Sequence, residues 1–220
     1  MTYTPVFYDW PQDVQPISQL FRAGGVAIDG GMTLGGASVE NPEPGGRGEL
    51  LLGFTQFADP DTNRRAGWML SRLLNGSIMR VRLWTPSVQL ITLADLGLTV
   101  VGNDWTSNPT APITTAAAKG AVTIIIDMTA YGPVMGRGHV LGFASGSYEF
   151  AHEAMNVVYA GSIATVTLAP PLRRALTISD VAKFRPSMMV TCSNARDVAN
   201  KFKWAQTMAM NDANLVESLV

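Results

Sequence analysis

The sequence predicts a mainly β protein, a β-sandwich or small barrel flanked by one α-helix at about residues 60–75, with further β-strands towards the C-terminus. Three observations lead to this prediction. Short apolar segments recur along the chain between glycines and prolines, which is typical of strands joined by turns. In the second half these segments follow one another at close spacing, as in sandwiches and barrels. The segment at about residues 60–75 has the apolar spacing of an amphipathic helix.

The same patterns divide the chain into three parts. Residues 1–101 are predicted to form an N-terminal β unit with an arm and the flanking helix. Residues 102–120 are rich in small and polar residues and are predicted to be a long loop or linker. Residues 121–220 are predicted to supply the C-terminal strands. A length of 220 residues suits one large β domain or two small ones, and we expect the first and third parts to share one core.

The arm, residues 1–22, is rich in aromatic residues and proline. A continuous helix is excluded there, because each proline lacks an N–H donor and restricts the residue before it. Two interpretations stay open: an edge strand on the chain's own core, or an arm that lies on a neighbouring subunit. The candidate subunit-interface residues of the arm are Tyr3, Phe7, Tyr8 and Trp10.

The helix prediction rests on both ends of the segment and on its spacing. Asp59 suits the N-cap, Pro60 the first helical position, and Gly76 the position just past the end. One apolar stripe runs along the segment: Ala66, Met69, Leu70, Leu73 and Leu74. The outer face carries Arg64, Arg65 and Arg72. A solvated face, phosphate contacts and contact with a neighbouring subunit all remain open for them, and we treat them as further candidate subunit-interface residues.

Several strands are predicted around the helix. Glycine-rich residues 23–39 predict two short strands, residues 40–48 a polar loop, and residues 50–57 another strand. Residues 77–84 alternate, which predicts a half-buried strand. Beyond the linker, strands are predicted at residues 122–128, 139–144, 147–151, 155–159, 163–168 and 187–192. Residues 195–220 suit helix or strand, and we favour strands at 201–208 and 214–219.

Composition limits the classes of function. Charged residues make up 15% of the chain, below the roughly 25% of ordinary domains, which leaves open either a largely polar but uncharged surface or a surface partly covered by neighbours. The net charge of −1 argues against a dedicated nucleic-acid binder. A single cysteine, Cys192, excludes an internal disulfide framework and a thiolate cluster. We expect no membrane segment and no signal peptide, and therefore synthesis in the cytoplasm.

No motif predicts an enzyme, a metal site or a cofactor site. His152 opens a segment like that of zinc proteases, but Asn156 stands where the second histidine is needed. Asp59 opens a segment like a calcium loop, but Arg64 and Leu70 occupy the required glycine and glutamate positions. The spacing of Asp127, Glu149 and Glu153 does not indicate a hydrolase. We therefore expect no catalytic, cofactor-binding or metal-ligating residues.

Three stretches resemble the distal tail proteins that close the tail tube of siphophages. The first is the strand–helix–strand unit of residues 48–84, and the second is the turn Pro170-Pro171-Leu172-Arg173 after a run of strands. The third is the C-terminal segment, residues 215–219. Together they cover about half of the chain.

The resemblance implies a ring-forming, tail-tube-like domain in a homo-oligomer, a hexamer, within the virion. Such a ring would have the tail tube protein on one face and the tail hub or baseplate on the other, with DNA only as passing cargo. The alternative is a host-surface or carbohydrate-binding β-module of a tail tip. Its candidate aromatic residues are Trp10, Trp84, Trp105 and Trp204.

Overall fold

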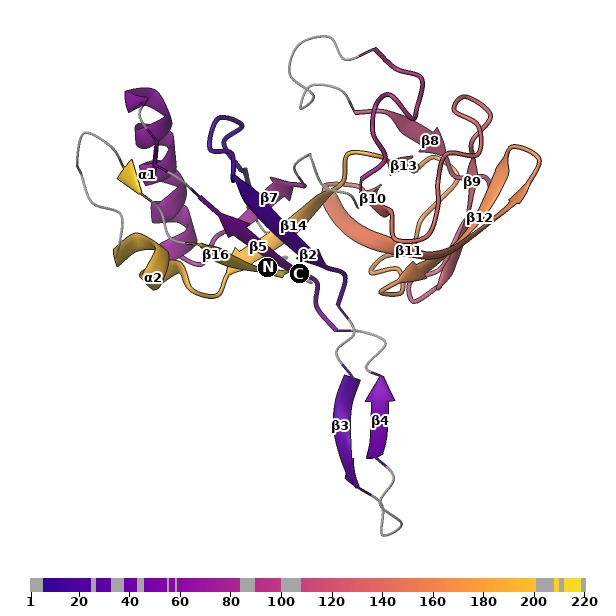
Figure 1. Cartoon of the computed structure of the whole chain (residues 1–220), viewed down its shortest axis with the longest axis horizontal. Coiled ribbons are helices and arrows are strands. Elements are labelled where there is room, and N and C mark those ends of the chain that lie inside the picture. Colours follow the sequence, from indigo (N-terminus) through magenta and orange to yellow (C-terminus); the bar gives the residue numbers. More distant parts are fainter. Residues whose placement is uncertain are drawn as a thin grey trace, which may run out of the picture.

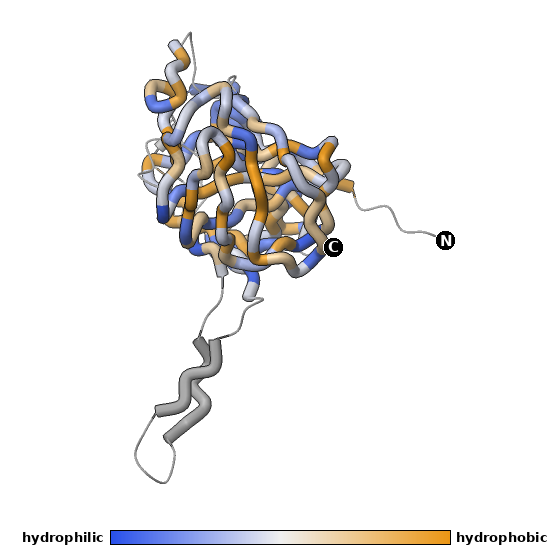
Figure 2. The backbone as a smooth tube through the Cα atoms, turned by 90° about the vertical axis from the view of Figure 1, so that its right-hand side faces the viewer, coloured by the Kyte–Doolittle hydropathy of each residue, from blue (hydrophilic) through white to orange (hydrophobic). Residues whose placement is uncertain are grey.

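The computed structural model describes residues 6–24, 27–32, 38–42, 46–54, 56–57, 59–83, 90–99, 108–200, 208–209 and 212–218. Within these residues the protein is mainly β, which confirms the predicted class. Two six-stranded sheets lie side by side, and two helices flank one of them (Figure 1). Apolar and polar residues alternate along many strands of the body (Figure 2), as expected for sheets with one buried face.

The first sheet combines strands from both ends of the chain. Its order is β1 (Phe7–Asp9), β7 (Ile78–Arg82), β14 (Ser187–Cys192), β16 (Ala213–Glu217), β5 (Glu49–Gly53) and β2 (Ser18–Arg22). Only the β1–β7 pair is parallel. In β7, Met79 and Val81 are buried and alternate with half-buried neighbours, so the predicted alternation is confirmed.

The second sheet is antiparallel and strongly curled. Its order is β8 (Thr110–Pro112), β13 (Val181–Lys183), β10 (Val140–Ser145), β11 (Tyr148–Ala160), β12 (Ile163–Ala169) and β9 (Thr123–Asp127). The chain just after β8 meets β9 at a single bridge, Ile113 to Ile126. This one bridge is not a continuous ladder, so the sheet does not close into a barrel.

Two strands predicted separately at 147–151 and 155–159 form the single long strand β11. The strand stays continuous because a bulge between Ala154 and Asn156 takes up one extra residue, Met155, whose side chain is exposed. The alternation is broken there, and the sequence pattern therefore suggested a gap.

The described residues pack in two cores. One contains α1 (Pro60–Leu74) and the inward side chains of the first sheet, and the other fills the curled second sheet. The described residues form two cores rather than one, and both predicted parts contribute to each: β14 and β16 join the first core, and Ile91, Leu93 and Leu96 join the second. A curled sheet covers much of its own apolar face, and this removes the need for a common core.

The second sheet is an insertion between two neighbouring strands of the first. Its strands come from residues 110–183, and they lie in the chain between β7 and β14, which pair with each other. The chain leaves and returns at one point, where the N–H of Leu83 donates to Pro186 O at 2.9 Å. The predicted linker at 102–120 is wrong at residues 110–113, since β8 lies there and Ala111 and Ile113 are buried.

A two-stranded ribbon projects away from both sheets (Figure 1). It consists of β3 (Ala27–Met32) and β4 (Ser38–Pro42), paired antiparallel. The two predicted strands are therefore present, but the predicted polar loop at 40–48 is wrong at residues 40–42, where β4 continues. A second small sheet pairs β6 (Gln56–Phe57) with β15 (Met208–Ala209).

The helix α1 has the predicted N-cap and the predicted glycine past its end, and its predicted buried face is confirmed except at Leu74, which is 48% exposed. Asp59 caps it by accepting a hydrogen bond from the N–H of Thr62 at 2.8 Å, and Gly76 has a φ of +69° just past the end. Ala66, Met69, Leu70 and Leu73 are buried.

The C-terminal region contains a helix that the sequence reading did not favour. This short helix, α2 (Ala195–Asn200), packs beside α1 and buries Val198. The predicted strand at 214–219 is confirmed as β16. Most of the strand predicted at 201–208 lies outside the described residues.

Replacing Leu70 by aspartate should prevent folding. Leu70 is 3% exposed in the first core, and an unpaired carboxylate there should cost at least about 4 kcal/mol. The matched control is Leu74→Asp on the same helix, because Leu74 is 48% exposed and its change should cost within about 0.5 kcal/mol. Circular dichroism with urea unfolding measures both, and a folded Leu70→Asp protein of normal stability would show that the helix face is misassigned.

Candidate functional site

The projecting ribbon joins the body at a tightly packed root. The two legs approach each other at Gly24 and Gly46, which lie just outside β3 and β4. Gly24 has a φ of +93°, and a Cβ on it would lie 2.3 Å from Gly46 O. Only glycine suits such a backbone conformation and such a close approach. The root therefore depends on the absence of a side chain at residue 24.

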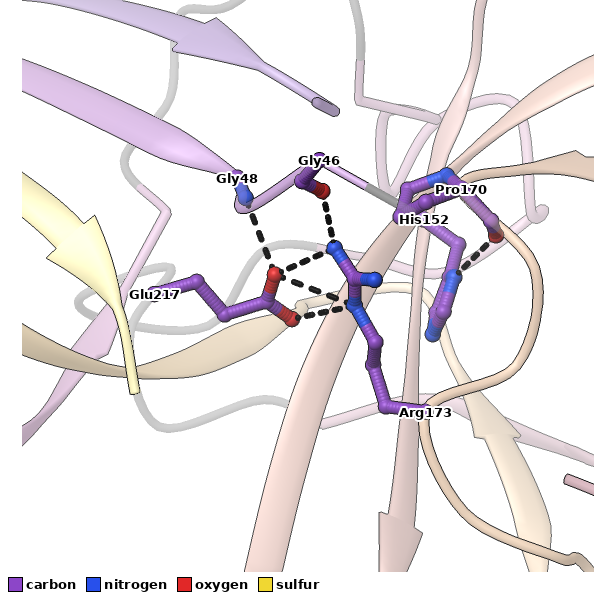
Figure 3. Close-up of polar contacts among 6 residues, drawn as sticks. All are labelled: Gly46, Gly48, His152, Pro170, Arg173 and Glu217. Carbon is purple, nitrogen blue, oxygen red and sulfur yellow. Dashed lines mark hydrogen bonds and ion pairs between the residues drawn. The ribbon is translucent and has the colours of Figure 1, made fainter. Parts of the chain in front are cut away.

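A buried ion pair holds this root (Figure 3). Nη2 of Arg173 lies 2.7 Å from Oε2 of Glu217, and Nε of Arg173 lies 3.1 Å from both carboxylate oxygens. The arginine also donates to Gly46 O, and Oε2 of Glu217 accepts from the N–H of Gly48 at 2.9 Å. The two side chains are only 9% and 2% exposed. We call Arg173, Glu217, Gly46 and Gly48 the ribbon clasp.

Each half of the clasp comes from a different sheet. Arg173 follows β12 of the second sheet, and the turn before it is fixed by Leu172, whose N–H donates to Ala121 O at 2.9 Å. Glu217 ends β16 of the first sheet, where its own N–H donates to Gly48 O at 2.8 Å. The clasp thus ties both sheets and the ribbon together at one point.

His152 lies beside the clasp and is fully enclosed (Figure 3). Its Nδ1 lies 2.8 Å from Pro170 O, so Nδ1 carries the proton and donates it to the carbonyl. The pKa of His152 is lowered to about 4, chiefly by burial and to a smaller extent by Arg173, while the hydrogen bond to Pro170 opposes both effects. A neutral imidazole therefore braces the turn that carries Arg173.

The predicted interface residues of the arm lie mostly on the chain's own surface. The ring of Phe7 lies edge-on to Tyr148 with centroids 5.1 Å apart, and Tyr8 lies edge-on to Trp68 at 5.9 Å. Residues 6–22 thus follow the first open interpretation, an edge strand on their own core. Tyr3 lies outside the described residues.

Trp10 needs a correction as an interface candidate. It is 5% exposed, stacks on Phe54 at 6.0 Å and donates its Nε1–H to Val14 O at 2.8 Å. Its large apolar ring is buried inside this chain, so it has no face to offer a neighbour.

The three predicted arginines remain on the outer face of α1, each beside a partner from this chain. Arg64 pairs with Asp61 and Arg65 with Asp13, both at 3.2 Å. Arg72 lies over the ring of Tyr8 at 5.0 Å from its centroid. The two ion pairs offset the charges of Arg64 and Arg65, which weakens the case for phosphate contacts there, whereas the ring of Tyr8 leaves the charge of Arg72 unchanged.

The candidates for enzyme chemistry lie apart from one another. Asp127 accepts hydrogen bonds from Thr129, whereas Glu149 forms ion pairs with Arg80 and Lys183. The described part of the chain contains no group of three or more His, Cys, Asp or Glu residues that could hold a metal ion. None of its helices is long and apolar enough to cross a membrane.

Comparison with known proteins leaves the chain without an assigned family. No family model matches the sequence, and no curated protein matches it. The functional argument therefore rests on the ribbon and its clasp. Sequence reasoning named Arg173 and the segment of Glu217 only as points of resemblance, since 44 residues separate the two partners.

Breaking the clasp on one side should destabilise the protein strongly. Glu217→Gln keeps an acceptor for Gly48 but leaves the buried Arg173 charge uncompensated, at a cost of about 3–5 kcal/mol. The double variant Arg173→Met with Glu217→Gln should recover most of this loss, because no buried charge remains. Arg22→Ala is the control, since the Arg22–Glu49 pair is 62% and 47% exposed and should contribute less than about 1 kcal/mol. Urea unfolding measures the free energy of unfolding of each variant. If the losses from changing the two side chains simply add in the double variant, the two side chains are not coupled.

The buried histidine should make stability depend on pH. Because the pKa of His152 is lowered from 6.5 to about 4, the unfolded chain takes up a proton first as pH falls. The stabilisation is complete above about pH 6.5 and is lost as pH falls towards about 4, with a loss of about 2 kcal/mol between pH 7 and pH 5. His152→Asn keeps a donor for Pro170 and should flatten this dependence. An NMR titration of the two histidines checks whether His152 is the source of the pH dependence. A His152 resonance that titrates near pH 6.5 would contradict this assignment.

Proposed function

We propose that the chain is a structural subunit of a siphophage tail, of the distal tail type, without enzymatic activity. In this proposal several copies, six by resemblance, form a ring that joins the tail tube to the hub or baseplate around the DNA channel. The observation that carries the proposal is the projecting β-ribbon with its clasped root. The ribbon of each copy docks on the next copy in the ring.

The physical argument starts from the ribbon itself. A two-stranded ribbon alone is at best marginally stable in water, because it has too little apolar area to bury. Its strand edges present unpaired N–H and C=O groups, which readily pair with another chain. The clasp anchors one leg of the root, at Gly46 and Gly48, by a buried ion pair. An anchored root and open edges suit a contact that repeats around a ring.

The first sheet offers a second contact of the same kind. Its edge strands, β1 and β2, lie at opposite ends of the strand order. Exposed apolar residues mark both edges: Val6 beside β1, and Ile17 and Leu20 at β2. Two different edges that meet head to tail generate a ring when the rotation between copies closes.

The alternative, a host-surface or carbohydrate-binding module, has less support. Binding of sugars needs an aromatic ring with a free face. Trp10 is buried, and Trp84, Trp105 and Trp204 lie outside the described residues. Trp68 is partly exposed, but Arg72 and Tyr8 both contact its ring.

Removal of the ribbon should abolish assembly and leave the body folded. Residues 25–45 can be replaced by two glycines, because Gly24 and Gly46 already lie in close contact. We expect the full chain to form a closed ring, with a mass several times 23.6 kDa, and the ribbon-deleted chain to be a monomer. Light scattering and particle imaging measure the assembly.

The control for this experiment is the unfolding free energy of the body, which should change by less than about 1 kcal/mol, because β3 and β4 pair with each other and with no strand of the two six-stranded sheets. A full chain that stays monomeric at high concentration, or a deleted chain that still forms the ring, would contradict the proposed function.

A further inference from the structure

The outer side of α1 carries a groove in which large apolar side chains stay exposed. Its volume is about 520 Å³. Trp68 and Leu74 line it and are 41% and 48% exposed, and α2 contributes Ala199. The other lining residues are Arg64, Gly67, Leu70, Ser71 and Asn75. The groove thus leaves apolar area on the surface of the single chain that a partner can bury.

A positive charge without an ion pair lies beside this groove. The guanidinium of Arg72 lies 5.0 Å from the ring centre of Tyr8 and 5.8 Å from that of Trp68. Among the described residues it has no carboxylate partner, and its Nε is buried without a hydrogen-bond acceptor. The two rings hold the guanidinium in place but do not neutralise it, so a carboxylate from another chain would be attracted to this position.

A second cation, Arg64, lies in the groove wall. It pairs with Asp61 at 3.2 Å, but the two side chains are 74% and 70% exposed. An ion pair so open to water is weak, so the guanidinium of Arg64 can also accept a carboxylate from a partner chain.

The groove adjoins an open edge of the first sheet. Tyr8, whose ring lies edge-on to Trp68 at 5.9 Å, belongs to β1. This strand ends the strand order and pairs only with β7 among the described strands. Val6, just before it, is 63% exposed. We call Arg64, Trp68, Arg72 and Leu74 the receiving face.

The segment that forms the ribbon has the opposite charge. Residues 25–45 contain the acidic residues Asp29, Glu40 and Glu43 and no lysine or arginine. Asp29 and Glu40 are register partners in β3 and β4, so they share one face of the ribbon. Like charges directly opposite each other destabilise a pair of strands. Cations from a partner would therefore stabilise the ribbon as well as the contact.

The ribbon and the receiving face of one chain lie apart. The helix α1 packs against α2, β6 and β14. In Figure 1 this helix lies at the left of the body, whereas the ribbon projects below the body. The match in charge therefore serves a contact between two copies.

We propose that the receiving face of one copy binds the ribbon of the next copy, with the face of Asp29 and Glu40 against Arg72 and Arg64. Trp68 and Leu74 are covered by the same contact. The inference rests on the proposed function, since it names the surface on which the ribbon docks in that ring. Two different surfaces meet in this contact, as a head-to-tail ring requires.

Reversing the charges on each surface tests the contact. The receiver variant carries Arg64→Glu with Arg72→Glu, and the ribbon variant carries Asp29→Lys with Glu40→Lys. Either variant alone brings like charges together and should need at least about tenfold more protein than the wild type to assemble. An equimolar mixture should form rings again, because each reversed surface meets its opposite when the two variants alternate. Light scattering and particle imaging measure the assembly.

The matched control is Arg137→Glu, an exposed residue before β10, which should assemble as the wild type does. Circular dichroism checks folding, and Arg64→Glu alone replaces a receiver variant that does not fold, because its side chain is 74% exposed. A folded receiver variant that assembles normally, or a mixture that does not recover, would overturn this inference and leave the proposed ring standing. A wild-type chain that stays monomeric would contradict both.

Discussion

The arrangement of the molecule depends on the buried pair of Arg173 and Glu217. Taking two charges out of water is costly, and the cost is offset only when geometry is good and the remaining hydrogen-bonding groups are satisfied. Both conditions hold here, since Glu217 also accepts from Gly48 and Arg173 also donates to Gly46. An apolar pair of similar volume could match the stability but would not fix a direction. The charged pair specifies how two sheets and a ribbon meet.

This constraint adds to the packing between the two sheets. The second sheet is inserted between β7 and β14 and has its own core, but β11 lies against β14, and Val140 and Ala151 join the first core. An inserted domain can still move about the two chain segments that join it unless contacts such as these prevent it. The clasp and the Glu149 ion pairs with Arg80 and Lys183 provide two such contacts. The relative position of the sheets is therefore held by charge as well as by packing.

Local signals explain what could be predicted from the sequence. Asp59, Pro60 and Gly76 mark the ends of α1 within one segment, and alternation marks β7 within five residues. The clasp has no local signal, because Arg173 and Glu217 come from different sheets. The role of Gly24 depends on its close contact with Gly46, and the sequence around either residue does not indicate that contact. The strand β8 was missed because its residues are small. Ala111 is fully buried, but so small a side chain gives no clear apolar signal in the sequence.

The ribbon lies apart from the two six-stranded sheets. Ordering each residue of a chain costs about 1–2 kcal/mol of conformational entropy, and burial of apolar surface normally offsets this. The ribbon projects from the body, and its two strands pair with each other and with neither large sheet. Nevertheless its root is specified by a glycine contact, two backbone hydrogen bonds and a buried ion pair. The clasp stabilises the single chain by joining the two sheets at this root, whereas the strands beyond it pair only with each other in the described residues, and this is why the ribbon, rather than the arginines of α1, carries the case for the proposed assembly.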